Sequence, residues 1–471
     1  MDKSHWFDEA MAREGGRDAV ERASSRLEGD RRADVCIIGG GFTGLWTALQ
    51  LKERRPALDV ALIEKDLCGS GSSGRNGGFA MSWSSKVTTL LKLSGAQEAV
   101  RLFRASEEAV VRIGAFCREH GIDAQFRHDG WLWTASNETQ TGAWTPTLEA
   151  LDRLGEHPFR ELSRAEVQAR AGSTAHIAGV LDRGVATVQP ALLARGLARV
   201  AREKGVAIYE RTPMTALERA RPARVRTPRG AITADTVVFA LNAWAIEIPE
   251  FRPYVFTLAS DIVATEPAPE RLREIGWTDG TAISDSRLFV NYYRTTTDGR
   301  IAFGKGGGPV AFGGRLGETF DGPSLRPAEV ERTLREWYPA LKDKRIASHW
   351  RGPVTRTKTG LPFFGRMDAH PNIVYGHGYT GNGVGPSYTG GRILASLALG
   401  LDDEWTESPL AQGPPGRFPP EPIRYVGAQL VRAAIRRKEA AEDAGQRPRR
   451  LDVFLTGLSP AGLVPTKKKG A

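Results

Sequence analysis

The chain has 471 residues, 41% hydrophobic and 25% charged, which is typical of a globular protein of two or three domains. No apolar run approaches the roughly 20 residues of a membrane-spanning helix, and the N-terminus lacks the apolar core of a secretory signal, so we expect a cytoplasmic protein. The three cysteines form no C-x-x-C pair, which disfavours disulfides and a cysteine-based metal site.

The net charge of +10 invites a nucleic-acid partner, but the charge is unevenly distributed along the chain. Residues 422–471 contain eleven Lys and Arg against four Asp and Glu, so most of the excess belongs to the C-terminal end. The rest of the chain is nearly balanced. We therefore expect no nucleic acid as a partner, and a nucleic-acid function of the basic tail remains an alternative.

Residues 1–30 are polar and predict an N-terminal arm rather than a domain. A β-branched run at 35–38 follows, then a glycine-rich turn at 39–44, a stretch with helical spacing, and a second β-branched run at 60–63. Strand, turn, helix and strand within about 30 residues form a βαβ unit.

The turn of this unit has the spacing of a phosphate-binding site, with Gly39, Gly41 and Gly44 in a G-x-G-x-x-G motif. The first glycine permits the tight turn, the second lets the backbone approach a pyrophosphate, and the third permits close packing of helix on strand. The helix N-terminus attracts the anion. Glu64 ends the second strand, where a carboxylate accepts hydrogen bonds from ribose hydroxyls and repels a 2′-phosphate. Together these features predict a dinucleotide site.

The middle of the chain changes character. Residues 191–204 predict an amphipathic helix, and from 254 to 304 strand patterns follow one another without crossover helices, which predicts an antiparallel sheet. Residues 372–400 return to strand, glycine loop and helix. Their second G-x-G-x-x-G motif lacks a following strand and acid, so we predict an anion-facing loop there rather than a second dinucleotide site.

This order of patterns predicts the fold class α/β plus α+β. A Rossmann-type nucleotide-binding domain is built from discontinuous segments, and a mostly antiparallel substrate domain is inserted in it. The predicted parts are an arm at 1–30, the nucleotide-binding domain at 31–85, 160–245 and 345–405, the substrate or cap domain at 86–159 and 246–344, and a proline-rich linker with a basic helical tail at 406–471.

Residues 425–443 of the tail predict a helix with Val426, Leu430 and Ala434 on one face. We expect this helix to dock on the nucleotide-binding domain or at a contact between two copies, and the sequence leaves a homodimer open. Its basic side chains make a membrane-surface or nucleic-acid role the alternative.

The segment after Glu64 resembles the flavin-contacting loop of the D-amino-acid-oxidase-like (DAO) superfamily, which includes glycine, sarcosine and γ-glutamylputrescine oxidases. Its string Ser73–Gly78, SGRNGG, is most similar to the γ-glutamylputrescine oxidase branch. Further blocks at 185–217, 234–245 and 349–397 are similar to the same superfamily, so the resemblance covers roughly residues 33–400. The combination is specific to the superfamily but not to a substrate.

The resemblance implies FAD between the two domains of a glutathione-reductase-like FAD fold. Sarcosine oxidases attach their flavin to a cysteine in the block matching Pro353–Thr359, where this chain has none, so we expect non-covalent FAD. The glycine turn and the resemblance together predict these cofactor-binding residues: Gly39, Gly41, Phe42, Thr43, Gly44, Glu64, Lys65, Ser73, Arg75, Asn76, Gly77, Gly78, Val185, Asn242, Trp244, Gly381, Asn382, Gly383 and Val384. Val185 is expected on the adenine side, and Gly381–Val384 at the flavin's pyrimidine edge.

The resemblance also implies the reaction, which is oxidation of a CH–NH or CH–NH2 group of a small-molecule amine or amino-acid-like substrate. Hydride passes to flavin N5, the imine hydrolyses, and O2 is the expected acceptor, giving H2O2. The cofactor carries this chemistry, so no metal or Ser–His–Asp set is required, and the sequence shows none. The alternatives are a hydroxy-acid dehydrogenase and an FAD-dependent RNA-modifying protein that uses the basic tail.

Substrate contacts are expected from the inserted sheet. Period-two alternation places Tyr292 and Arg294 on one face of a strand and Tyr293 on the other. An arginine fork binds carboxylate, phosphonate or phosphate groups. Relatives use a strand lysine to activate oxygen, and Lys305 lies near the equivalent strand. We predict Arg294, Lys305 and Tyr292 as catalytic residues, and Arg294, Tyr292, Arg315 and Arg356 as substrate contacts.

Overall fold

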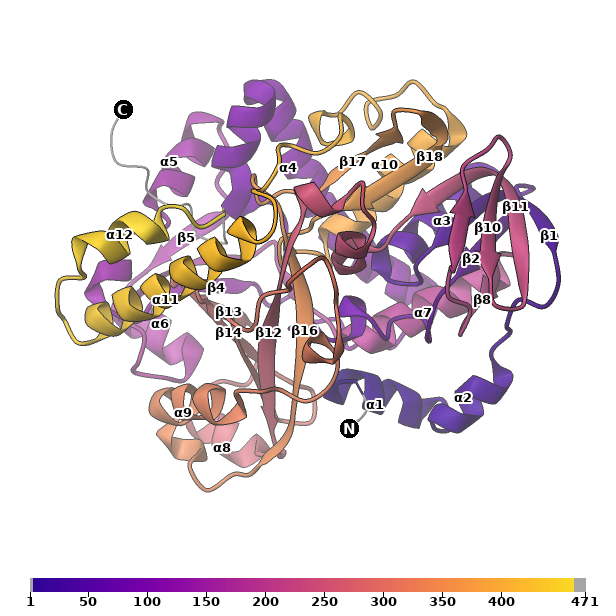
Figure 1. Ribbon diagram of the computed structural model, residues 1–471. Coiled ribbons are helices and arrows are strands. Elements are labelled where there is room, and N and C mark those ends of the chain that lie inside the picture. Colours follow the sequence, from indigo (N-terminus) through magenta and orange to yellow (C-terminus); the bar gives the residue numbers. More distant parts are fainter. Residues whose placement is uncertain (1–2, 461–471) are drawn as a thin grey trace.

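The computed structural model of the chain describes residues 3–460 and contains two large sheets surrounded by helices (Figure 1). Within these residues, no helix combines the length and apolar character needed to cross a membrane. The two sheets correspond to the two predicted domains, and the cavity described below lies between them.

The first sheet is mainly parallel. Its strands run in the order β17 (Phe363–Met367), β18 (His370–His377), β11 (Gly230–Phe239), β1 (Arg31–Ile38), β2 (Val60–Ile63) and β8 (Ala207–Tyr209). Only the edge strand β17 of this series is antiparallel to its neighbour. The short strands β9 (Ala216–Glu218) and β10 (Ala223–Thr227) extend β11 as an antiparallel meander. The buried β-branched runs of β1 and β2 suit a parallel sheet covered on both faces.

Close helix packing depends on small residues. Helices α3 (Phe42–Arg54), α7 (Pro190–Glu203) and α10 (Pro386–Leu399) belong to one core with the first sheet. A Cβ atom at Gly391 of α10 would lie 2.7 Å from the Cβ atom of Trp46 in α3. Glycine there therefore lets α10 approach α3 closely.

The second sheet is antiparallel except for one pair of strands. Its order is β16 (Ile346–Arg356), β12 (Phe256–Thr265), β15 (Ile301–Lys305), β14 (Asn291–Thr295), β13 (Ala282–Asp285), β4 (Trp131–Ala135), β6 (Ala178–Asp182) and β5 (Phe159–Leu162). The parallel pair is β13 with β4. The remaining elements are α4 (Val87–Glu119), α5 (Thr145–Arg153), α6 (Arg164–Ala171), α8 (Pro269–Glu274), α9 (Pro327–Trp337) and the small ribbon of β3 (Phe79–Ala80) with β7 (Ala186–Thr187). The predicted fold class is confirmed.

The structure moves two predicted domain boundaries. The predicted segment 160–245 begins too early, because β5 and β6 pair with β4 in the second sheet. The predicted segment 345–405 also begins too early, because β16 pairs with β12 along its whole length. A short apolar strand has the same local pattern in either sheet, and only its distant partner decides which sheet it joins.

The first and last helices of the described residues pack against the rest of the chain. Helices α1 (His5–Arg13) and α2 (Arg17–Ala23) form the N-terminal arm, in which Trp6 and Phe7 are fully buried. At the other end, α11 (Ile423–Asp443) and α12 (Arg450–Thr456) pack on each other and lie beside the second sheet (Figure 1).

The helix predicted in the tail is therefore present, but its contacts differ from the prediction. Arg432 Nε donates to the Gly307 carbonyl at 2.9 Å, and Glu439 Oε1 accepts the Phe289 N–H at 3.0 Å. Helix α11 therefore docks on the predicted substrate domain and not on the nucleotide-binding domain. On the predicted apolar face, Val426 and Leu430 are more than half exposed and only Ala434 is buried. Polar contacts thus determine which face of α11 turns inward.

Candidate functional site

A cavity of about 420 Å³ lies between the two sheets. Its lining comes from the carboxyl ends of the parallel strands β1, β2, β8 and β11, from the loop after β18, and from β12, β14 and β16 of the second sheet. Ligands of open α/β sheets bind at this edge. Most of the predicted cofactor residues line the cavity: Gly39, Gly41, Phe42, Thr43, Glu64, Lys65, Ser73, Arg75, Asn76, Gly77, Asn242, Trp244, Gly381, Gly383 and Val384.

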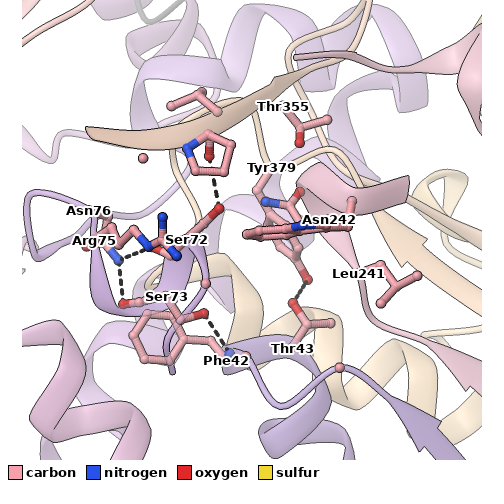
Figure 2. A pocket seen from close by; sticks show the side chains of 18 of the residues that line it. Phe42, Thr43, Ser72, Ser73, Arg75, Asn76, Leu241, Asn242, Thr355 and Tyr379 are labelled. Carbon is pink, nitrogen blue, oxygen red and sulfur yellow. Dashed lines mark hydrogen bonds between the residues drawn. The ribbon is translucent and has the colours of Figure 1, made fainter. Parts of the chain in front are cut away.

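The glycine turn has the geometry that its motif predicted. Gly39 has φ +113°, and a Cβ atom there would lie 2.7 Å from the Ala240 carbonyl oxygen. Gly44 does not line the cavity, but a Cβ atom on it would lie 2.0 Å from the Gly39 oxygen. No side chain caps α3 at Gly41, and Phe42 N–H donates to Ser73 Oγ at 2.9 Å (Figure 2). The turn leaves backbone room for an anion at the start of α3.

Glu64 occupies the position expected for a ribose-binding acid. Its Oε2 accepts the Gly40 N–H at 2.8 Å and its Oε1 accepts the Asp66 N–H at 3.0 Å. Burial raises the pKa of this carboxyl group, and the two backbone N–H groups oppose that shift. A carboxylate oxygen has more than one acceptor direction, so both oxygens can still accept hydroxyl groups from the cavity.

The same end of the cavity contains residues that sequence reasoning missed. These are Thr212, Pro213 and Met214, which follow β8 and line the cavity. Beside them lie two predicted residues, Lys65 and Trp244, with the Lys65 ammonium 4.5 Å from the centre of the Trp244 ring. The missed signal was the position of Thr212–Met214 after a third parallel strand, whose carboxyl end meets the same sheet edge.

The predicted flavin-contacting loop is held by its own side chains (Figure 2). Ser72 Oγ donates to the Pro353 carbonyl at 2.9 Å, and Asn76 Nδ2 donates to the Ser73 carbonyl at 2.8 Å. Arg75 is nearly fully buried, donates through Nε to the Ser70 carbonyl at 2.8 Å and pairs with Asp321 at 2.8 Å. The Arg75 guanidinium therefore stabilises the loop from within.

The second glycine loop closes the opposite wall. The hydroxyl of Tyr379, another residue missed in the sequence, accepts a hydrogen bond from Thr43 Oγ1 at 3.0 Å and so joins this loop to α3 (Figure 2). Asn242 accepts the Gly378 N–H at 3.1 Å. Asn382 does not line the cavity, because its side chain turns away and donates to the Ser82 carbonyl at 2.9 Å.

Two further predicted cofactor residues lie outside the cavity. Gly78 adopts φ +76° behind the loop. Val185 packs with Trp131 and Trp133 in a core of the second sheet, and its carbonyl accepts the Gly130 N–H at 3.0 Å. The prediction for Val185 is wrong because the strand before it, β6, belongs to the second sheet rather than to the nucleotide-binding sheet.

The predicted alternation along β14 is confirmed, but only Tyr292 lines the cavity. The Tyr292 ring packs against Gly304, where a Cβ atom would lie 2.2 Å from the ring. The Tyr292 hydroxyl lies 2.8 Å from Ser260 Oγ. Arg294 shares this face but is only 1% exposed, and it donates to the Gly77 carbonyl at 2.9 Å and the Val188 carbonyl at 2.6 Å. Its guanidinium thus contacts the chain and not the cavity.

Lys305 and Arg315 are not brought to the cavity either. Lys305 pairs in register with Asn291, donates to its Oδ1 at 3.0 Å, and so lies on the face of the sheet opposite to Tyr292. Arg315 is exposed in a loop. Lys305, predicted as catalytic, is kept from the cavity by the register of its strand, and Arg315, predicted as a substrate contact, by its place in an exposed loop.

Arg356, the last residue of β16, is the predicted substrate contact that reaches the cavity with its charge available. Its side chain has no hydrogen bond or ion pair with any residue in 3–460. Burial alone lowers the pKa of Arg356 to about 10, so the group stays positively charged at neutral pH. Lys86 lies close enough for Arg356 to help lower the Lys86 pKa, after burial, to about 7. Arg356 therefore places a positive charge at this end of the cavity.

Comparisons with known proteins agree with this geometry. Residues 34–397 match the model of the DAO family, described as FAD dependent oxidoreductase. Gamma-glutamylputrescine oxidoreductase of Escherichia coli (strain K12) is 31% identical over 406 residues, which are 84% of this chain and 91% of that protein. The probable oxidoreductase OrdL of Rhizobium meliloti (strain 1021) is 34% identical over 388 residues, 80% of this chain and 86% of that protein.

The fold comparison extends the likeness to a solved structure. Glycine oxidase from Geobacillus kaustophilus superposes with a TM-score of 0.68 at 21% identity, and the superposition covers 81% of this chain and 98% of that chain. The two chains share a fold.

Proposed function

The chain belongs to the DAO family of FAD dependent oxidoreductases, and from that premise we propose that it oxidises the C–N bond of an amine or amino-acid-like substrate bearing an acidic group. One observation supports the proposed acidic group on the substrate, namely the unpaired guanidinium of Arg356 at the cavity. A partly buried cation without a partner costs free energy, and a substrate carboxylate offsets that cost.

The cavity fits FAD. The Gly39–Gly44 turn gives a pyrophosphate its backbone approach, and Glu64 offers acceptors to ribose hydroxyls. The N–H groups of Asn76 and Gly77, which line the cavity, have no acceptor within residues 3–460 and are free for a bound ring. We propose non-covalent binding, since the three cysteines, Cys36, Cys68 and Cys117, are buried elsewhere.

When bound, FAD supplies the acceptor for the hydride that leaves the carbon next to the substrate nitrogen. The chain's own residues bind and orient the substrate. Arg356 binds the acidic group. Tyr292 forms part of the cavity wall, and its hydroxyl is hydrogen-bonded to Ser260. Met81, Leu258 and Val354 line the cavity with apolar surface, which excludes water from the reacting carbon.

Substrate class is tested by anaerobic reduction of the FAD-loaded protein, followed by bleaching of the flavin absorption band. The panel pairs γ-glutamylputrescine, glycine and proline with matched amines that lack the carboxylate, and with hydroxy acids. We expect an amine with a carboxylate to bleach the flavin fastest. Bleaching by hydroxy acids alone would contradict the proposal, because Arg356 fits their carboxylate equally well but the bond oxidised would be C–O.

Molecular oxygen is the proposed final acceptor. Air admitted to the substrate-reduced protein should restore the flavin band and yield one H2O2 per flavin. Slow recovery in air, with fast recovery on adding an artificial acceptor, would instead identify a dehydrogenase.

A further inference from the structure

Four consecutive carbonyl groups of the loop 74–77 each accept a hydrogen bond from a side chain elsewhere in the chain. The donors are Ser4 Oγ to Gly74 at 2.6 Å, Trp350 Nε1 to Arg75 at 2.9 Å, Trp6 Nε1 to Asn76 at 3.0 Å and Arg294 Nε to Gly77 at 2.9 Å. Two of these donors, Ser4 and Trp6, belong to the N-terminal arm. We call this set of four bonds the carbonyl clamp.

The carbonyl clamp determines where the loop's N–H groups point. In a trans peptide the N–H points away from the C=O of the same plane, so the bond to the Arg75 carbonyl orients the Asn76 N–H. The bond to the Asn76 carbonyl likewise orients the Gly77 N–H. Asn76 and Gly77 line the cavity whereas Trp6 and Trp350 do not, so these N–H groups point away from the clamp and toward the cavity.

The same two N–H groups are the unpaired ones. The Gly78 N–H donates to Asn76 Oδ1 at 2.7 Å and the Arg75 N–H donates to the Ser72 carbonyl at 3.3 Å. Within residues 3–460, no acceptor contacts the N–H of Asn76 or of Gly77. Asn76 and Gly77 are partly buried, where unpaired N–H groups are costly, which indicates that a bound group accepts from them.

Trp6 is held tightly in its role as donor. It is 0% exposed, lies edge-on to Trp350 with ring centres 5.7 Å apart, and has the Arg294 guanidinium 4.9 Å above its ring. Gln189 Nε2 donates to the Trp6 carbonyl at 2.8 Å. The family match begins at residue 34, so the arm supplies half of the carbonyl clamp from outside the matched region.

We propose that Trp6 is a positioning residue of the cofactor site, which holds the Gly77 N–H as a hydrogen-bond donor to bound FAD through the Asn76 carbonyl. The N-terminal arm is thereby a working part of that site. The inference rests on FAD as the proposed cofactor and is independent of the substrate. A hydrogen bond to flavin is stronger in the more negative reduced state, so the arm also raises the flavin's midpoint potential.

The test compares Trp6→Phe with Trp277→Phe. Trp6→Phe removes the Nε1 donor and keeps an aromatic ring between Trp350 and Arg294. Trp277 is equally buried, but its Nε1 has no partner among residues 3–460 and its ring packs on Tyr338 in the core of the second sheet. Trp277→Phe therefore loses the same atoms away from the loop. Both apoproteins are titrated with FAD, and the midpoint potential of each bound flavin is measured.

We expect Trp6→Phe to raise the Kd for FAD about three- to tenfold, as loss of one hydrogen bond predicts. We also expect a more negative midpoint potential and faster hydrogen exchange of peptides covering 74–78. Trp277→Phe should leave all three unchanged. Equal effects of the two variants, or no effect of Trp6→Phe on Kd and potential, would show that Trp6 is only a core residue.

Replacement of Trp6 by 3-benzothienylalanine keeps the shape of the side chain and exchanges the N–H for sulfur. It gives the same test in a protein whose core is intact, should Trp6→Phe fold poorly. Failure of the proposed amine oxidation is distinguishable from failure of this inference, because the titration and the potential require no substrate.

Discussion

The arginines around the cavity differ in what their guanidinium groups contact. Arg75 binds Asp321 and a loop carbonyl, and Arg294 binds three carbonyls, so both stabilise the chain itself. Arg356 has no such partner within residues 3–460. A partly buried arginine without a partner in the described part of the chain is placed for a ligand.

Arg356→Gln should raise the KM for a carboxylate-bearing amine by roughly 10- to 100-fold, because a charge-assisted bond contributes about 1.5–3 kcal/mol. The Kd for FAD should not change. Steady-state kinetics with a substrate and its analogue lacking the carboxylate check this, with Arg315→Gln, an exposed arginine, as the control. Equal losses for both substrates would contradict a role of Arg356 in binding the acidic group.

Gly39→Ala should abolish FAD binding. The substitution places a Cβ atom 2.7 Å from the Ala240 oxygen at φ +113°, and such strain costs at least about 1–2 kcal/mol. The flavin-to-protein ratio after purification measures the effect. Gly427→Ala is the matched control, since nothing lies within 4 Å of a Cβ atom there and it should stabilise α11 by up to about 1 kcal/mol. Full flavin content in Gly39→Ala would refute the assignment of the turn.

At the scale of elements, α11 is fastened to the second sheet mainly by polar and charged groups. Glu439 accepts the Phe289 N–H, and Asp443 pairs with Arg287, which also binds the fully buried Asp285. Burial, aided by Asp285, raises the pKa of Glu439 from 4.5 to about 7, while Arg287 and Lys305 oppose the shift. The docked helix therefore holds a protonated carboxyl group at mildly acidic pH.

This pKa predicts a pH-dependent contact. The native state binds a proton that the unfolded state releases near pH 4.5, so the stabilisation is fully present below that pH and is lost as the pH rises through about 7. Its size is up to about 3 kcal/mol. Between pH 5 and 8 the melting temperature of wild type should fall relative to that of Glu439→Gln as the pH rises, because the amide cannot ionise. Parallel curves over this range would show that Glu439 does not titrate there.

Prediction from sequence succeeded where the determining residues are close together along the chain. The βαβ unit, its glycine turn and Glu64 depend on local spacing, and the loop from Ser73 to Gly77 follows directly. Lys305 and Val185 were misplaced because their faces and sheets depend on partner strands distant in sequence, such as Asn291 opposite Lys305. The contribution of Trp6 could not be predicted, since no local pattern links residue 6 to residue 76.

At the scale of the whole molecule, the N-terminal arm and α11 lie on either side of the matched oxidoreductase region in the sequence and pack on different parts of it. The arm contacts the loop 74–77, whereas α11 contacts the outer face of the second sheet, opposite to Tyr292. The arm is thus part of the proposed cofactor site, whereas the C-terminal tail stabilises the second sheet from outside.

Removal of residues 422–471 should consequently lower the melting temperature but keep bound FAD and substrate-dependent bleaching. Calorimetry and the flavin-to-protein ratio test this expectation. An RNA gel-shift assay of both forms addresses the basic tail, and we expect no binding by either. Loss of flavin from the shortened protein would mean that the tail also stabilises the cavity.

The hydrogen bond between Thr43 and Tyr379 joins two walls of the cavity that are far apart in the sequence and are therefore synthesised at different times. The glycine turn emerges early, yet the loop that faces it leaves the exit tunnel only when the oxidoreductase region is almost complete. We therefore expect that a chain ending before Tyr379, which lacks this wall of the cavity, does not retain flavin.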